Sequence, residues 1–259
     1  MGKPKSARRR DRGSIREADD ALVHAVPRIQ ASRKPFEPKT PAQGRYASII
    51  DSNDLIFCRG PMGTGKTHVP VWQAADALAK RKIEKIIVSR PAVEAEESYG
   101  ALPGELQDKW DPFFKPVKEI LVKRLGEGAV EMFRKNGKIE IAPLGFLRGN
   151  TFENCWVLFD EAQNATPGQM KLFLTRIGEN CKVIVDGDPD EQKDVSGLSG
   201  FEDAWRRLKG LDGVGYMTFE FDDIMRSGLS KAILGRYRST NDNYEGEVGR
   251  EELRKAIGG

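Results

Sequence analysis

The sequence of 259 residues is poor in the side chains that build disulfide frameworks and zinc sites, with only three cysteines and two histidines. Cys58, Cys155 and Cys181 are odd in number and lack metal-ligand spacing. Two of them lie in or beside expected buried strands, so all three are interpreted as reduced core residues. With only His24 and His68, a histidine-based zinc site is not expected.

Long hydrophobic runs are also missing. No apolar stretch has membrane-spanning length, and the amino terminus lacks the apolar segment of a secretory signal. Four acids between Asp11 and Asp20 argue against a mitochondrial transit peptide. We therefore expect a cytoplasmic protein with no membrane partner. A hydrophobic content of 39% over this length suits one sizeable domain or at most two small ones.

The charge is unevenly distributed. The formal net charge is +3, yet residues 1–40 hold eleven Lys/Arg and five Asp/Glu, which leaves the rest at −3. Residues 7–12 form the core of this basic arm, which either contacts nucleic-acid phosphates or is a solvated tail. We expect a disordered arm over residues 1–38, a folded domain over 39–238 and a polar tail over 239–259.

The most informative segment is Gly60-Pro61-Met62-Gly63-Thr64-Gly65-Lys66-Thr67, which matches the phosphate-binding loop GxxxxGK[ST]. Glycines let several backbone N–H groups point at one anion, Lys66 can reach the β- and γ-phosphates, and the Thr67 hydroxyl can ligate Mg²⁺. An apolar run before the loop and a helical pattern after it, beginning near His68, support this interpretation. The loop and His68 are therefore expected to bind a nucleoside triphosphate.

The chain alternates between two apolar periodicities, which predicts an α/β fold with a mostly parallel sheet and helices on both faces. Strands are expected at 54–58, 85–89, 138–142, 155–159, 182–186 and 214–219. Helices are expected at 41–50, 67–80, 113–125, 128–135, 167–177, 201–208 and 222–236. The first of these begins with Thr40 as N-cap, Pro41 at the first helical position and Gln43 closing a capping box.

A second motif is the apolar run 156–159 followed by Asp160 and Glu161. In open α/β sheets, ligands bind at the carboxyl ends of the strands. Asp160 is therefore expected to hold Mg²⁺ together with Thr67, and Glu161 to polarise the attacking water as general base. P-loop kinases do not need a glutamate at this position, so Glu161 favours a hydrolase. A third apolar run, 183–185, ends at the same edge and is expected to bring Asp188 near the γ-phosphate.

These segments together resemble the PhoH-like family of P-loop ATPases, which is related to the superfamily 1 helicase core. Residues 60–67 are similar to its GPAGTGKT, with Met62 in place of alanine, and residues 160–164 match its DEAQN. Further similar segments are 90–95, 102–104, 139–143, 147–149, 169–171, 173–178 and 223–226. The resemblance covers about residues 39–237.

The resemblance implies a RecA/helicase-like three-layer P-loop fold that binds ATP and Mg²⁺. It also implies coupling to single-stranded RNA and assembly into a homo-oligomeric ring such as a hexamer. Gln163 and Asp188 are then expected beside the nucleotide. In related helicases a glutamine ahead of the loop reads the adenine edge, and we favour this role for Gln43 over the capping box. No ribonuclease domain is recognised, so RNA cleavage is not expected.

Two departures from the family pattern bear on turnover. The family's GDPTQ has its glutamine four residues after the glycine, whereas here Gln192 follows Gly187 by five, with Glu191 in its place. Asp186 also replaces a small hydroxyl residue and adds negative charge near the phosphates. Either Gln192 reaches the γ-phosphate through a bulged turn, or γ-phosphate sensing is altered. With the charge that Asp186 adds, the second alternative predicts slow catalysis.

Four arginines have open roles. Arg226 and Arg176 are candidates for stabilising the transferring phosphoryl group, in trans if the protein assembles, or else are solvated helix residues. Arg90 and Arg148, each near a strand end, are candidates for nucleic-acid phosphate contacts. The aromatic residues Trp110, Phe113 and Phe114 either stack on bases or pack in the core, and we favour packing.

The sequence thus predicts an Mg²⁺-dependent ATPase that acts on or is stimulated by single-stranded RNA, as a helicase or remodelling enzyme built from one motor lobe per subunit. The alternative is a nucleotide-switched RNA-binding or assembly scaffold with very slow turnover. A small-molecule phosphotransferase ranks last, because no substrate lid is recognisable.

Overall fold

The computed structural model describes residues 35–91, 114–147, 149, 151–191 and 195–240. Most of the basic arm and the polar tail therefore lie outside the described residues. So do Trp110, Phe113, Arg148 and Gln192, so the predictions made for them have no structural outcome.

Within these described ranges, six parallel strands form one sheet in the order β3-β2-β4-β5-β1-β6. The strands are β1 Leu55–Arg59, β2 Lys85–Ser89, β3 Ile139–Ile141, β4 Cys155–Phe159, β5 Lys182–Gly187 and β6 Val214–Thr218. Each agrees with an expected strand to within one residue at either end. Neighbouring parallel strands need crossover connections, which the intervening helices supply. The predicted parallel sheet is confirmed.

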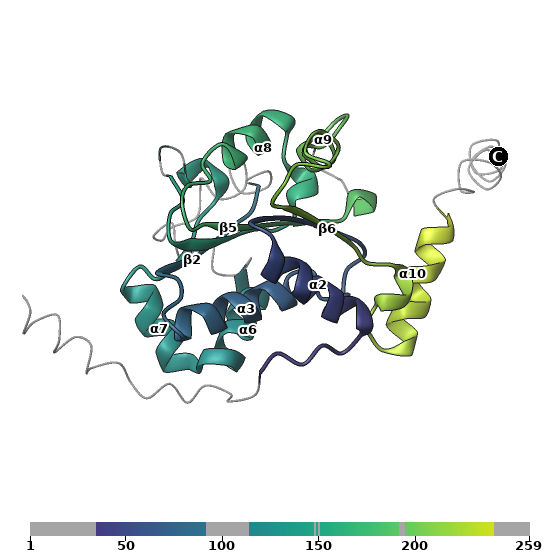
Figure 1. Cartoon of the computed structure of the whole chain (residues 1–259). Coiled ribbons are helices and arrows are strands. Elements are labelled where there is room, and N and C mark those ends of the chain that lie inside the picture. Colours follow the sequence, from purple (N-terminus) through teal and green to yellow (C-terminus); the bar gives the residue numbers. More distant parts are fainter. Residues whose placement is uncertain (1–34, 92–113, 148, 150, 192–194, 241–259) are drawn as a thin grey trace, which may run out of the picture.

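Helices cover both faces of this sheet, with α2, α3, α6 and α7 on one side and α8 and α9 on the other (Figure 1). The helices are α2 Pro41–Ser52, α3 His68–Ala79, α6 Lys115–Leu125, α7 Glu127–Lys135, α8 Pro167–Leu174, α9 Gly200–Arg207 and α10 Gly228–Thr240. Short 3₁₀ turns are η2 Leu144–Leu147, η3 Ala162–Asn164, η4 Pro189–Glu191 and η5 Phe221–Asp223. The three-layer P-loop architecture expected from the sequence is present.

Two hydrophobic cores lie on opposite faces of the sheet, because alternate strand residues point to opposite sides. On β1, Ile56 and Cys58 belong to the core under α3, whereas Leu55 and Phe57 belong to the core under α8 and α9. Both faces of the central strands are thus buried, which explains their nearly continuous apolar sequence.

Local capping explains where several helices begin. Thr40 precedes α2, and its hydroxyl accepts a hydrogen bond from the Gln43 backbone at 3.2 Å, as predicted. The second half of the predicted capping box is wrong, because Gln43 Oε1 accepts from the backbone of Lys39 at 2.9 Å. Helix α8 carries a complete capping box instead, formed by Thr166 and Gln169.

Two helix boundaries differ from the prediction. Helix α8 ends at Leu174, because the chain turns there and Ile177 forms a bridge with Phe152. The helix expected at 222–236 is split into η5 and α10. Between them the backbone is extended at Ile224, and the N–H of Met225 donates to the carbonyl of Gly63 at 3.0 Å, which is incompatible with a continuous helix.

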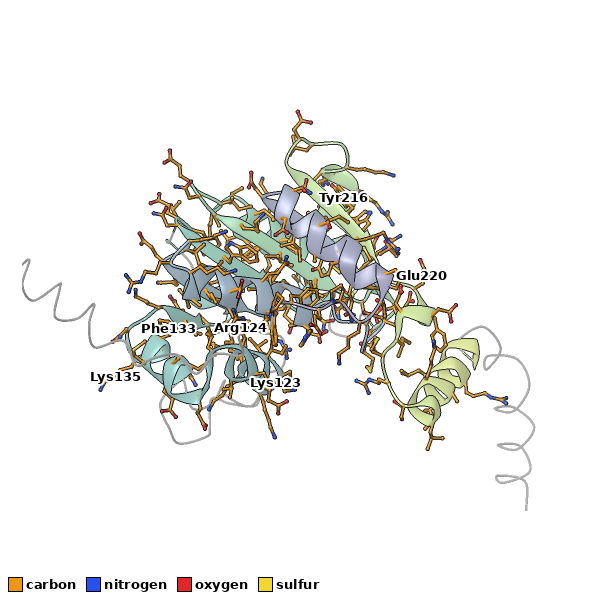
Figure 2. The ribbon with its side chains drawn as sticks, turned by 60° about the horizontal axis from the view of Figure 1, so that its bottom comes forward. Lys123, Arg124, Phe133, Lys135, Tyr216 and Glu220 are labelled. Carbon is orange, nitrogen blue, oxygen red and sulfur yellow. The ribbon has the colours of Figure 1, made fainter. Side chains whose placement is uncertain are left out.

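The three cysteines are free and buried, which confirms their interpretation as reduced core residues. Among the described residues, no helix is both long and apolar enough to span a membrane. In the α6–α7 layer, Lys123 and Lys135 are exposed, whereas Arg124 is buried and pairs with Asp76 (Figure 2).

Candidate nucleotide and cation site

The phosphate-binding loop connects β1 to α3 and owes its shape to three glycines with positive φ angles. Gly60, Gly63 and Gly65 have φ of 141°, 81° and 104°. A Cβ on Gly65 would lie 2.8 Å from Gln43 Nε2, so a side chain there would be strained and also crowded. The backbone therefore curls as an anion-binding loop requires.

Gln43 braces this loop from the preceding helix. Its Nε2 donates to the carbonyl of Thr64 at 2.9 Å, while its Oε1 holds the backbone of Lys39. The side chain is only 4% exposed. Both polar ends are therefore engaged within the chain, and the adenine contact predicted for Gln43 requires one of these bonds to be exchanged.

Lys66 and Thr67 begin the loop-to-helix transition. The ammonium of Lys66 donates to the carbonyl of Gly60, which folds its side chain back over the loop. The hydroxyl of Thr67 lies 3.4 Å from Oδ1 of Asp160, at the end of β4. The structure thus brings together the two side chains that were predicted to ligate Mg²⁺, and the ligation itself stays a prediction.

Asp160 also has a partner that the sequence did not reveal. Arg90, directly after β2, donates from Nε to Asp160 Oδ2 at 2.9 Å and from Nη2 to the same oxygen. Burial by itself raises the pKa of Asp160, but the Arg90 guanidinium and a hydrogen bond with Asp186 outweigh it, so the net pKa lies below the ordinary value. Arg90 thus keeps Asp160 ionised.

Asp186 lies beside Asp160 on the neighbouring strand. Phe159 pairs with Val185 in the parallel register, so Asp160 and Asp186 occupy the next opposed positions. Their carboxyl groups are hydrogen-bonded to each other. Burial raises the pKa of Asp186 well above its usual range, and the charge of Asp160 raises it further. The pair therefore favours one ionised and one protonated carboxyl group.

Glu161 is oriented by Gln163. Glu161 adopts a left-handed backbone conformation with φ of 56°, at the sharp turn into η3. Gln163 Nε2 donates to Glu161 Oε2 at 2.7 Å, and its Oε1 accepts from the backbone of Asp188 at 3.0 Å. Gln163 is 1% exposed, so one buried amide joins the ends of β4 and β5. Neither of its amide atoms is directed at solvent.

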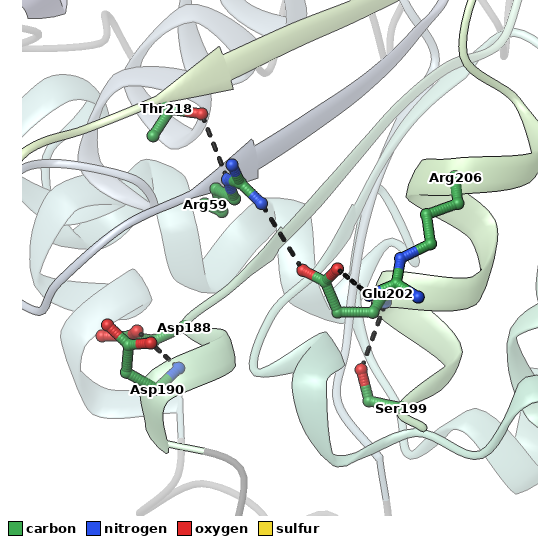
Figure 3. A network of polar contacts seen from close by, with 7 residues as sticks. All are labelled: Arg59, Asp188, Asp190, Ser199, Glu202, Arg206 and Thr218. Carbon is green, nitrogen blue, oxygen red and sulfur yellow. Dashed lines mark hydrogen bonds and ion pairs between the residues drawn. The ribbon is translucent and has the colours of Figure 1, made fainter. Parts of the chain in front are cut away.

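Asp188 is buried behind this amide at the end of β5. Burial raises its pKa to about 6, while Lys66 acts in the opposite direction. Its Oδ1 accepts a hydrogen bond from the backbone of Asp190 at 3.2 Å (Figure 3). The structure thus brings Asp188 to the same edge as Lys66, as the convergence of the strands predicted.

The start of the phosphate-binding loop is anchored by Arg59, the last residue of β1. Its Nε donates to Thr218 of β6 at 3.2 Å, and its Nη1 lies 3.7 Å from Glu202 of α9 (Figure 3). The guanidinium carbon is 4.6 Å from the centre of the Trp205 ring. These contacts tie β1, β6 and α9 together next to Gly60.

The two candidate catalytic arginines occupy different parts of the fold. Arg226 packs over the loop of its own chain, since a Cβ on Gly63 would lie 3.0 Å from its Cγ and Nε. Arg176 donates to the carbonyls of Leu147 and Leu172, and its own carbonyl accepts from Phe152, which precedes β4. Arg176 therefore lies near the amino ends of the strands, opposite the loop of its own chain. The catalytic role of Arg176, in cis or in trans, stays a prediction, and its position favours a role in trans.

The structure places two of the aromatic side chains named in the sequence analysis, Phe114 and His68, and nucleotide binding by His68 stays a prediction. Phe114 is 1% exposed and packs in the core, as favoured, with Arg90 at 5.8 Å from its ring centre. His68 begins α3 between the rings of Phe36 and Trp72. Burial lowers the pKa of His68, helped by nearby lysines, which favours a neutral imidazole.

Sequence reasoning missed the partners of the two candidate acids, Asp160 and Glu161. Arg90 was predicted to contact nucleic acid, and its position after β2 was the only signal for a place at the site edge. Gln163 was predicted to line the nucleotide, yet its amide orients Glu161. Each contact forms where the ends of neighbouring strands meet. Only the order of the strands in the sheet determines which strand ends are neighbours.

Comparison with known proteins places the chain in a family. A family model described as PhoH-like protein matches residues 35–238. The chain belongs to the PhoH-like family. It is 43% identical over 212 residues to a PhoH-like protein of Bacillus subtilis, covering 82% of this chain and 66% of that protein. It is 42% identical over 220 residues to Protein PhoH of Escherichia coli, covering 83% of this chain and 62% of that protein.

This PhoH-like chain thus spans somewhat less than two thirds of the length of these relatives. Among solved structures, the large terminase of a thermophilic bacteriophage in complex with ADP aligns with a TM-score of 0.46 and 13% identity. That alignment covers 78% of this chain and 50% of the terminase. A likeness at this level says nothing about activity.

Proposed function

We propose that this PhoH-like chain is an Mg²⁺-dependent ATPase that acts on, or is stimulated by, single-stranded RNA as a homo-oligomer. The observation that supports hydrolysis most directly is the bond from Gln163 to Glu161 at 2.7 Å, next to the Thr67–Asp160 pair. A carboxylate held by a buried amide at the strand edge suits a general base.

The residues present fit a nucleotide and a magnesium ion. The phosphate-binding loop forms a cradle that a Cβ on Gly60, Gly63 or Gly65 would obstruct. The hydroxyl of Thr67 and the carboxylate of Asp160 are the hard oxygen donors that Mg²⁺ prefers. When bound, the ion would neutralise charge on the β- and γ-phosphates.

The remaining steps, phosphate binding, proton transfer and charge stabilisation, are assigned to side chains and backbone groups of the protein. The loop N–H groups and Lys66 bind the phosphates, with Lys66 exchanging its bond to Gly60 for a phosphate oxygen. Glu161 takes a proton from the attacking water, and Gln163 orients Glu161. Arg226, packed over Gly63, is placed to stabilise charge on the transferring group in cis.

The RNA and assembly parts of the proposal rest on the sequence. The basic arm of residues 1–40 carries an excess of six positive charges, suited to phosphate contacts that weaken as salt rises. Arg176 is remote from its own phosphate loop, and it would reach a neighbouring subunit's site by exchanging its bonds to Leu147 and Leu172.

The test is ATP turnover with Mg²⁺, with and without single-stranded RNA, over a range of protein concentrations. Lys66→Ala serves as the blank and Glu161→Gln separates chemistry from binding. Turnover that rises with RNA and with concentration supports the full proposal. Turnover that depends on neither leaves an ATPase without RNA coupling or assembly.

A second candidate, a nucleotide-held scaffold with very slow turnover, is favoured by the ion pair between Arg90 and Asp160. Because Arg90 occupies an oxygen of the cation-binding acid, it opposes Mg²⁺ there. Tight ATP binding with negligible turnover under every condition would select this alternative.

A further inference from the structure

Asp186 stands out among the buried polar groups of the described residues. It is 2% exposed, and its Oδ1 has no hydrogen-bond partner within the described part of the chain. A buried carboxyl oxygen without a partner is costly and calls for a ligand. Simple packing in the core does not account for an acid at this position.

The sheet directs Asp186 toward Asp160. Leu158 and Ile184 belong to the core that α3 covers, and side chains two residues further along each strand return to the same face. Asp160 and Asp186 therefore both lie on the α3 side, on paired strands about 4.8 Å apart. Thr67, at the start of α3, reaches the same place through its 3.4 Å contact with Asp160.

Other groups around Asp186 also favour a charged occupant. Cys58, opposite it on β1, is neutral because burial raises the pKa of its thiol, and Tyr46 is likewise neutral because burial raises its pKa. Among the described residues, Lys66 and Arg90 are the positive charges that act on the two acids. The guanidinium of Arg90 already occupies the position that a metal cation would take, since two of its N–H groups donate to one oxygen of Asp160.

We propose that Asp160 and Asp186 form a two-carboxylate site that binds Mg²⁺ or Mn²⁺ before nucleotide arrives, with the Thr67 hydroxyl as a third oxygen. Two carboxylates and a hydroxyl are hard donors that both ions accept. Cation binding displaces Arg90 from Asp160 Oδ2. This inference rests on the proposed nucleotide site and adds Asp186 as a cation ligand of that site.

The experiment is Mn²⁺ binding to the full chain without nucleotide, measured by electron paramagnetic resonance of free Mn²⁺. Asp186→Asn and Asp186→Thr should each weaken binding at least tenfold, and Asp160→Asn should weaken it similarly. The matched control is Asp212→Asn. Asp212 is an exposed acid just before β6, at the amino ends of the strands, and this variant should bind Mn²⁺ like the parent chain. Circular dichroism in EDTA checks that each variant is folded.

A second measurement needs no binding isotherm. Mg²⁺ without nucleotide should raise the melting temperature of the parent chain and of Asp212→Asn, but not of Asp186→Thr, since a ligand that binds only the folded state stabilises it. The proposal is overturned if the parent chain binds Mn²⁺ no more tightly than Asp160→Asn does. It is also overturned if Asp186→Asn binds Mn²⁺ as tightly as the parent chain.

Failure of this inference is distinguishable from failure of the proposed ATPase. RNA-stimulated turnover without nucleotide-free Mn²⁺ binding would remove the role of Asp186 alone. Mn²⁺ binding that depends on Asp186, with no ATP turnover, would leave the cation site and remove the motor function.

Discussion

Arg90 and Asp160 join the ends of two adjacent strands by a guanidinium that donates twice to one carboxylate oxygen. Their side chains are 19% and 5% exposed, so the pair is largely removed from water. This ion pair balances the negative charge of the carboxylate that is proposed to hold Mg²⁺. A nucleic-acid contact by Arg90 stays a prediction, and it requires the guanidinium to leave Asp160 first.

Replacing Arg90 by glutamine should lower the free energy of unfolding in EDTA by about 3 kcal/mol, because it leaves a buried carboxylate without its counter-ion. Urea denaturation measures the change. Arg90→Lys keeps the charge and should lose less. An unchanged unfolding free energy would show that Asp160 is satisfied by its other neighbours.

Glu161→Gln should reduce ATP turnover by about 10²–10⁴-fold while leaving ATP affinity within a few fold, because it removes a proton acceptor and keeps the shape. Gln163→Ala should lower kcat in the same direction but by less, since the base stays and loses its orientation. Steady-state kinetics and equilibrium binding of a fluorescent ATP analogue check both. If Glu161→Gln retains full turnover, another group is the base.

Gln43→Ala tests whether this glutamine reads adenine or braces the loop. Its bond to the Thr64 carbonyl predicts an equal loss of affinity for ATP and GTP, since the loop serves both nucleotides. Competition binding with the two nucleotides gives the ratio. A loss confined to ATP would establish the adenine contact instead.

Asp188→Asn should stabilise the protein at neutral pH and not at acidic pH. The folded pKa of Asp188 is raised to about 6, so ionising it costs more in the folded state than in the unfolded state. The parent therefore loses stability as pH rises from about 4 to 6. The variant's advantage should grow over that window to about 3 kcal/mol at pH 7. Urea unfolding from pH 4 to 7 measures it, with Asp212→Asn as control, and a constant difference would contradict the prediction.

Arg226→Ala should lower turnover at every protein concentration, because Arg226 packs over the loop of its own chain. Arg176→Ala should lower turnover only where subunits associate. Mixing each variant with Lys66→Ala separates the two cases. Restored activity in mixtures containing Arg226→Ala would place that arginine at a neighbour's site.

Much of the architecture was predictable because it is encoded locally. Alternating apolar runs predicted all six strands, and Thr40 and Pro41 marked the start of α2. The glycine pattern of the phosphate loop needs only its own backbone to curl. The helix predicted across 222–236 failed because the Met225 backbone docks on Gly63, a contact between segments remote in the sequence.

By itself the sequence determined the phosphate loop, the acids that end β4 and β5, and membership of the PhoH-like family, since each depends on neighbouring residues. Only the tertiary structure decided which groups meet: Arg90 with Asp160, Gln163 with Glu161, and Asp186 beside Asp160. The physical reason is that strand order and register select these partners. Strand order and register in turn depend on packing two separate cores against opposite faces of one sheet.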